Sequence, residues 1–162
     1  GLIAALGGEQ AGRSAVVLGA GGTARAAAWA LREAGASVAV WNRSAGRAQA
    51  LARGLGDAAI ARPHTADLLV NTTTVGMDEG MGPAEALTTL ALDSDLLTTY
   101  EQVVDFVYSA GQTPLLSSAR QLGIPTVDGL TILVAQGALS FERWTGLVGP
   151  LGAMRQAAER AG

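Results

Sequence analysis

Apolar and polar positions along the chain follow two periods, and together they predict strands that alternate with helices. Six short apolar runs have the length and continuity of strands buried on both faces. They are residues 15–18, 37–41, 58–61, 67–71, 102–107 and 124–127. Between them, apolar residues recur at helical spacing over residues 22–34, 44–55, 114–121 and 129–144. Alternation of this kind predicts a parallel sheet with helices on both of its faces.

The ends of the chain and two of the connections complete this pattern. A short helix is expected at residues 2–6, and a last amphipathic helix after Gly149-Pro150, to about Arg160. Residues 62–66 are too few for a full crossover helix, so the third connection should shorten to a turn. Residues 78–95 are polar and contain Gly and Pro, which predicts a loop with one turn of helix at 85–92.

The first strand leads directly into a glycine cluster and then into a helix. Gly19, Gly21 and Ala24 have the G-x-G-x-x-G/A spacing of a dinucleotide-binding turn. The first glycine permits the turn, the second lets a pyrophosphate approach bare backbone, and the small third residue lets the helix pack closely on the strand. Helix N–H groups beginning near Gly22 would point at the phosphates. The alternative is a glycine-rich turn that binds no ligand.

The tip of the second strand carries Asn42-Arg43-Ser44, and Arg47 follows one helical turn later. NAD-binding folds usually have Asp or Glu here, about 20 residues beyond the glycines, to bind the ribose hydroxyls. A carboxylate would repel a 2′-phosphate, whereas guanidinium groups can hold one through paired hydrogen bonds. The sequence therefore predicts NADP. The alternative, two solvated arginines, places cations where the helix dipole disfavours them.

The fourth strand ends in Asn71-Thr72-Thr73-Thr74-Val75-Gly76-Met77. Open α/β sheets bind ligands at the carboxyl ends of their strands, so these short hydroxyl side chains are candidates for a ligand contact. An ordinary turn after a threonine-rich strand is the alternative. Taken together, the patterns predict a Rossmann-like, doubly wound α/β domain over residues 1–162, with a mainly parallel six-stranded sheet.

Composition narrows the possible functions. The net charge is −3 and no basic stripe is present, which argues against a nucleic-acid partner. No apolar run approaches the roughly 18 residues of a membrane span, and no secretory segment opens the chain, so a cytoplasmic, membrane-free protein is expected. All eleven basic side chains are arginine, and any mechanism that needs lysine must find it outside this chain. With no cysteine and a single, loop-borne His64, no metal site is expected.

In their order along the chain, these motifs resemble those of the shikimate and quinate dehydrogenase family, specifically its C-terminal NADP-binding domain. The resemblance extends from Gly1 to about Gly149. It rests on the glycine turn, the Asn-Arg-Ser tip and the Asn-Thr-Thr-x-x-Gly-Met strand end, and on later segments. Those segments are residues 105–108, 113–116, 128–130 with Leu133 and Gln136, Phe141, and 144–146.

The resemblance implies a function and a set of site residues. Family members reduce 3-dehydroshikimate reversibly to shikimate with NADPH, a step of aromatic amino-acid biosynthesis through chorismate. The pyrophosphate would bind Gly19, Ala20, Gly21, Gly22, Thr23 and Ala24, and the adenosine ribose phosphate would bind Asn42, Arg43, Ser44 and Arg47. The nicotinamide half would bind Thr72, Thr73, Val75, Met77, Phe106 and Gly129. Substrate contacts would be Tyr108 and Gln136.

By the same resemblance, the catalytic Lys and Asp belong to an N-terminal substrate domain, and this chain is expected to begin after it. The chain alone should then bind the cofactor without turning over shikimate, and it could self-associate through the exposed domain interface. Alternatives left open are a relative acting on quinate, another NADP-linked dehydrogenase with the same sheet, and a non-catalytic nucleotide-binding module with a protein partner.

Overall fold

A six-stranded sheet forms the centre of the molecule in a computed structural model, which describes residues 1–78, 80–108 and 112–161. The strands are β1 (Ser14–Leu18), β2 (Ser37–Trp41), β3 (Ala58–Ala59), β4 (Leu68–Asn71), β5 (Gln102–Asp105) and β6 (Thr126–Val127). Their order is β3-β2-β1-β4-β5-β6, and every neighbouring pair is parallel. The predicted doubly wound fold is confirmed. The strand order reverses beside β1, which is where such sheets open a crevice for a ligand.

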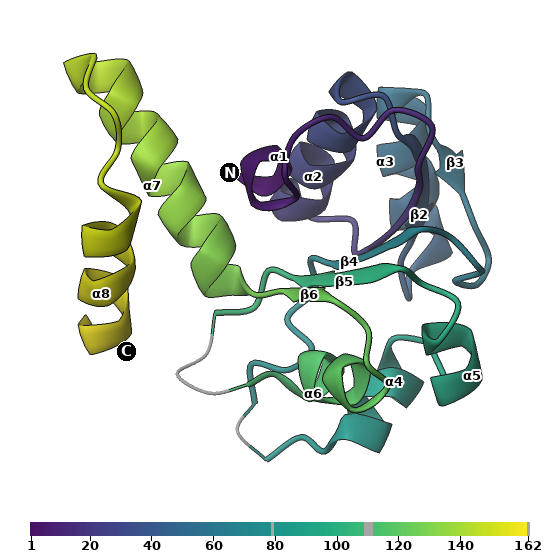
Figure 1. The fold of residues 1–162 in the computed structure, drawn as a ribbon. Coiled ribbons are helices and arrows are strands. Elements are labelled where there is room, and N and C mark those ends of the chain that lie inside the picture. Colours follow the sequence, from purple (N-terminus) through teal and green to yellow (C-terminus); the bar gives the residue numbers. More distant parts are fainter. Residues whose placement is uncertain (79, 109–111, 162) are drawn as a thin grey trace.

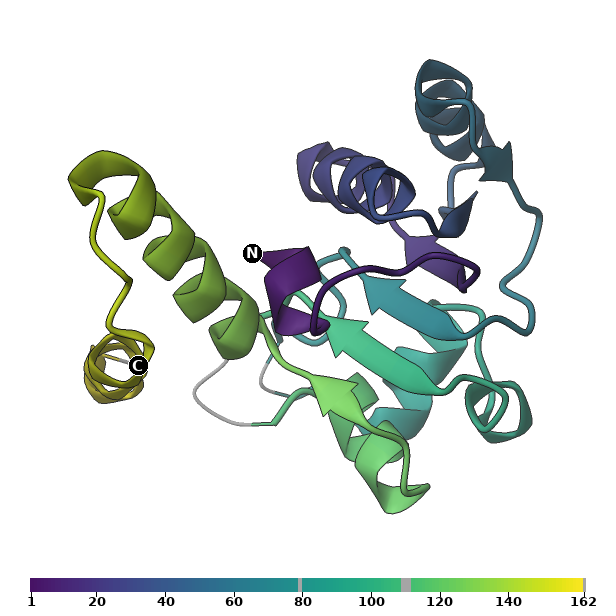
Figure 2. The same cartoon turned by 45° about the horizontal axis from the view of Figure 1, so that its top comes forward.

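Helices cover both faces of the sheet (Figure 1). They are α1 (Leu2–Ala5), α2 (Gly22–Glu33), α3 (Ala45–Leu55), α4 (Pro83–Thr89), α5 (Ser94–Leu97), α6 (Pro114–Gln121), α7 (Gly129–Thr145) and α8 (Leu151–Ala161). In Figures 1 and 2, α1, α2 and α3 lie over one face, and α4, α5 and α6 lie over the other.

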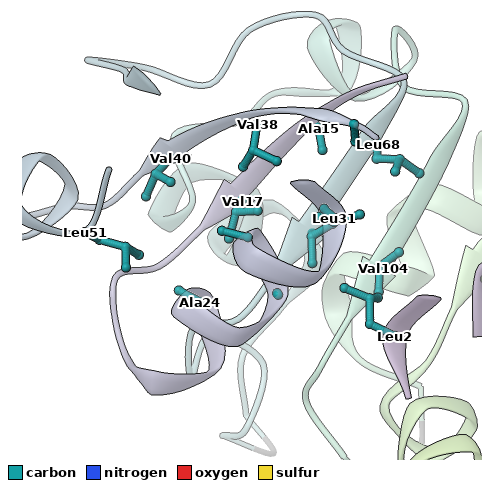
Figure 3. Packing of buried hydrophobic residues seen from close by; sticks show 14 of the residues in the cluster. Leu2, Ala15, Val17, Ala24, Leu31, Val38, Val40, Leu51, Leu68 and Val104 are labelled. Carbon is teal, nitrogen blue, oxygen red and sulfur yellow. The ribbon is translucent and has the colours of Figure 1, made fainter. Parts of the chain in front are cut away.

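The strand β1 is buried from both sides and divides the core in two. Ala15 and Val17 point into the cluster under α2 and α3 (Figure 3), whereas Val16 and Leu18 point into the cluster over α6. Each of these four side chains is at most 2% exposed. A strand with helices on both faces reads as a continuous apolar run, which is why residues 15–18 are identifiable from the sequence alone.

Three sequence expectations differ from the structure. A loop with one turn of helix was expected over residues 78–95, whereas the structure has α4 within this segment and α5 beginning at its end. Pro83 starts the first of them, and the Asp93 side chain caps the second by accepting a hydrogen bond from Leu96 N. The strands β3, β5 and β6 are each shorter than their apolar runs.

The third difference concerns the face that α2 presents to the sheet. The helical period predicts a buried face made of Ala26, Ala27, Ala30, Leu31 and Ala34. In the structure the buried residues are Ala24, Ala27, Ala28 and Leu31, and Ala26 is exposed. In an alanine-rich helix every face is weakly apolar, so only the packing of the sheet selects which one is buried.

The helices α7 and α8 form a hairpin that projects from the sheet (Figures 1 and 2). The first turns of α7 touch the core through Ile132, and a Cβ at Gly149 would lie 2.7 Å from Ala138 Cα, so the returning chain packs tightly on α7. Trp144 and Val148, near the turn, are 83% and 86% exposed. Among the described residues, no helix, α7 and α8 included, is both long enough and apolar enough to cross a membrane.

Candidate functional site

A hollow of about 340 Å³ opens where β1, β2 and β4 end. Leu18 pairs with Trp41 on one side and with Asn71 on the other, so the three strands stop at one level. The three motifs singled out in the sequence therefore meet at one edge. The lining residues are Gly19, Ala20, Gly21, Trp41, Asn42, Arg43, Arg47, Thr72, Thr73, Thr74, Val75, Thr89 and Leu90.

The glycines of the turn have different structural roles. Gly19 has φ +118°, and a Cβ there would lie 2.5 Å from Thr72 Oγ1, so no larger residue fits. Gly21 has φ −91°, and a Cβ on Gly21 or Gly22 would meet nothing within 4 Å. Gly19 is thus required by the fold, whereas Gly21 and Gly22 leave open space beside bare backbone, as a bound pyrophosphate needs.

The N-terminus of α2 lies at this open space. No side chain caps it and its first turn holds no acidic residue. Arg25 N is the first N–H to donate within the helix, to Gly21 O at 3.0 Å, so the N–H groups before it have no helical acceptor. Ala24 is completely buried against the sheet. Ala24 therefore serves the predicted site by letting α2 pack closely on the sheet. Thr23 is exposed at the start of the helix.

The arginines of the second strand tip face the same hollow. Arg43 and Arg47 line it, and neither guanidinium group makes a hydrogen bond or ion pair with another described residue. Asn42 Nδ2 donates to Ser44 O at 3.1 Å and shapes the turn. Ser44 precedes α3 without a side-chain cap and does not line the hollow. Two unpaired cations at a helix N-terminus form an anion-binding environment.

The threonine turn after β4 is held by its own hydroxyl groups. Thr72 Oγ1 donates to Leu18 O at 2.7 Å, and Thr73 Oγ1 donates to Asn71 Oδ1 at the same distance. Thr73 Oγ1 also accepts from Val75 N at 3.1 Å. Since these hydroxyl protons are already donated within the protein, Thr72 and Thr73 shape the wall of the hollow and can offer a ligand their remaining acceptor capacity.

A buried polar cluster beneath this turn was not identified as functional from the sequence. Asp105 is fully buried and accepts from Asn71 Nδ2 at 2.9 Å, Val107 N at 3.0 Å and Thr113 Oγ1 at 2.7 Å. Burial raises the pKa of Asp105, and the three hydrogen bonds oppose that rise. The cluster ties together β4, β5 and the start of α6. Its signal in the sequence is one acid inside the apolar run 102–107.

The residues predicted for the nicotinamide half lie partly outside the hollow. Met77 is 62% exposed and Phe106 packs partly on the α2 side of the core. Gly129 starts α7, and a Cβ there would be 2.5 Å from Val107 O, so this glycine brings the helix onto the end of β5. None of these three lines the hollow itself. Met77 follows β4, Phe106 follows β5 and Gly129 follows β6, and these three parallel strands are neighbours in the sheet.

The two predicted substrate residues lie on the side of the α7–α8 hairpin. Tyr108 Oη donates to Ala158 O of α8 at 3.2 Å. Gln136 is exposed on α7, and a Cβ at Gly1 would lie 3.0 Å from its Cβ. Their roles as substrate contacts stay predictions. Among the described residues, no group of three or more His, Cys, Asp or Glu side chains could hold a metal ion.

Comparisons with known sequences give a consistent result. Residues 3–73 match the family described as shikimate / quinate 5-dehydrogenase, and residues 129–159 match the shikimate 5′-dehydrogenase C-terminal domain. The shikimate dehydrogenase (NADP(+)) of Halobacterium salinarum is 44% identical over 152 residues, which cover 90% of this chain and 54% of that protein. The corresponding protein of Halorubrum lacusprofundi is 46% identical over 160 residues, which cover 92% of this chain and 54% of its own length.

Solved structures are similar over almost the entire chain. The shikimate 5-dehydrogenase of Thermus thermophilus, in complex with NADP(H) and shikimate, is 42% identical with a TM-score of 0.79, covering 99% of this chain and 60% of that one. The ligand-free 5-ketofructose reductase of a Gluconobacter strain is 31% identical, with a TM-score of 0.85. The match covers 99% of this chain and 61% of that one. The chain spans about half the length of the curated relatives it matches.

Proposed function

Because the chain belongs to the shikimate and quinate dehydrogenase family, we propose that it binds NADP(H) for a dehydrogenase that interconverts 3-dehydroshikimate and shikimate. The observation that carries this proposal is that one hollow combines bare glycine backbone with two arginines that pair with no described residue. Bare backbone beside a helix N-terminus suits a pyrophosphate, and the arginines suit the additional phosphate that distinguishes NADP from NAD.

The residues of this chain bind and orient the cofactor. Gly21 and Gly22 would receive the pyrophosphate at the start of α2, and Arg43 with Arg47 would hold the 2′-phosphate. The turn that begins at Thr72 would limit the position of the nicotinamide half. When bound, the cofactor supplies or accepts the hydride. The protein accelerates that transfer by fixing the reacting groups in contact and excluding water from them.

The proton that accompanies the hydride needs an acid/base group of its own. The family resemblance implies a lysine and an aspartate for this task, and the chain contains no lysine. We therefore propose that the catalytic pair lies outside this chain and that the chain alone binds the cofactor without turnover. Reduction of 3-dehydroshikimate by the purified chain at ordinary enzyme rates would contradict this proposal. Cytoplasmic location and self-association stay predictions.

A second candidate substrate follows from one comparison. The 5-ketofructose reductase structure resembles this chain as closely in backbone as the shikimate dehydrogenase does. The cofactor domain is therefore compatible with another polyhydroxylated carbonyl compound. In an enzyme carrying this chain together with a catalytic pair, Tyr108→Phe should impair turnover of 3-dehydroshikimate if Tyr108 contacts it. An unchanged rate would refute the predicted contact between Tyr108 and 3-dehydroshikimate.

The primary test is calorimetric titration of the chain with NADP⁺ and, separately, with NAD⁺. We expect NADP⁺ to bind more tightly, and Arg43→Ala to weaken NADP⁺ binding by about 10- to 100-fold, the loss expected for a charge-assisted contact. Arg53→Ala is the matched control because Arg53 is exposed on α3 and does not line the hollow. Equal affinity for the two nucleotides would contradict the assignment of the phosphate site.

A further inference from the structure

Arg62 reaches the same edge of the sheet as Arg43, from a neighbouring strand. The strands β2 and β3 are parallel, with Val40 paired to Ala59, and Ile60 N continues the pairing by donating to Val40 O at 3.0 Å. The chain leaving β3 therefore arrives beside the tip of β2. Arg62 follows two residues after Ile60 and is exposed.

A second hollow connects Arg62 to the proposed cofactor site. It measures about 510 Å³, and its lining includes Arg62, Ile60 and Asp93. Trp41, Asn42 and Arg43 line this hollow as well as the first one, so the tip of β2 forms a wall of both. Arg43 thus has the first hollow on one side and the hollow of Arg62 on the other.

The charges around the second hollow leave Arg62 without a counterion inside the described part of the protein. Its guanidinium group makes no hydrogen bond or ion pair there, whereas Arg13, Arg32 and Arg155 each pair with a carboxylate. The carboxylate of Asp93 lines the hollow too, but it accepts from Leu96 N at 2.8 Å and caps α5. Arg62 shares this hollow with Arg43 and pairs with no described carboxylate, so both guanidinium groups are available to an external anion.

We propose that Arg62 is a specificity-determining residue that, together with Arg43, holds the 2′-phosphate of NADP from the β3 side. The inference rests on the proposed cofactor function. A phosphate monoester carries close to two negative charges and three acceptor oxygens, so it can engage more than one guanidinium fork at once. Arg43 and Arg47 bind from the α3 side of the group, and Arg62 encloses it from the opposite side.

The test compares the affinities of Arg62→Ala, Arg62→Lys and the control Arg53→Ala for NADP⁺ and NAD⁺ by calorimetry. Arg62→Ala should weaken NADP⁺ binding by about 10- to 100-fold and leave NAD⁺ binding within about two-fold. Arg62→Lys should retain part of the preference, because a lysine keeps the charge but not the planar fork. Arg53→Ala removes the same charge away from the hollow and should change neither affinity.

The outcomes separate this inference from the function on which it rests. If the unmodified chain prefers NADP⁺ and Arg62→Ala keeps the same NADP⁺/NAD⁺ ratio, the role of Arg62 is refuted and the proposed function stands. An equal loss for both nucleotides would show a structural effect and also refute it. If the unmodified chain binds neither nucleotide, or binds both equally, the phosphate site and the role of Arg62 are refuted together.

Discussion

Gly19 and Gly21 lie two residues apart in one motif, and the structure predicts opposite consequences for replacing each with alanine. At Gly19, φ is +118°, where a side chain costs about 1–3 kcal/mol of backbone strain. The new Cβ would also lie 2.5 Å from Thr72 Oγ1 and displace it from Leu18 O. Losing that hydrogen bond adds about 0.5–1.5 kcal/mol. Gly19→Ala should therefore lower the free energy of unfolding by about 2–4 kcal/mol.

Gly21→Ala should leave the fold nearly intact and impair the ligand site. The backbone at Gly21 is extended, with φ −91°, and a Cβ there meets nothing within 4 Å. The expected loss of stability is below about 1 kcal/mol, because alanine is only a poorer N-cap than glycine. In the complex, however, the methyl group would occupy the space that the pyrophosphate must enter. NADP⁺ should then bind at least about 10-fold more weakly.

Thermal and urea denaturation, together with nucleotide titration, test this pair of variants. Gly19→Ala should lower the melting temperature by about 5–15 °C, since each kcal/mol corresponds to about 2–4 °C in a chain of this size. The denaturant slope should stay constant if only stability has changed. Equal stabilities of the two variants would refute the steric argument at Gly19. Unchanged NADP⁺ affinity in Gly21→Ala would refute the assignment of bare backbone to the pyrophosphate.

Two further predictions concern the carboxylates of Asp67 and Asp105, which accept hydrogen bonds within the protein. Asp67 accepts hydrogen bonds from Ser14 N at 2.6 Å and Ser14 Oγ at 2.7 Å, and these bonds lower its pKa. The carboxylate therefore contributes its full share to the stability of the fold above about pH 4, and this contribution is lost as the pH falls through the lowered pKa. Urea denaturation should show Asp67→Asn to be about 1 kcal/mol less stable at pH 7, a difference that shrinks toward pH 3; a constant difference would contradict the linkage. Asp105→Ala should lower the free energy of unfolding by about 3 kcal/mol or more, because Asn71 and Thr113 lose a buried hydrogen-bond partner. Asp105→Asn should lose much less stability. Equal losses in the two variants would show that the hydrogen bonds are not the cause.

Much of the local structure could be predicted because its causes are local. Thr113 caps α6 and Pro114 begins it, and the Asp128 side chain accepts from Thr131 N at 2.7 Å to start α7. These signals need only neighbouring residues. The same holds for the glycine turn, since strand, turn and helix follow one another directly in the chain. Its spacing suffices to predict where a phosphate would bind.

The sequence by itself determined the alternation of strands and helices, the glycine turn and the arginines at the β2 tip, because apolar period and turn chemistry act over a few residues. Only the tertiary structure decided which strands are neighbours. That choice placed Thr72 against Gly19, joined Asp105 to Asn71, and brought Arg62 and Arg43 to one hollow. The physical reason is that strand order and register depend on burying both faces of the sheet at once, and no local pattern encodes that global condition.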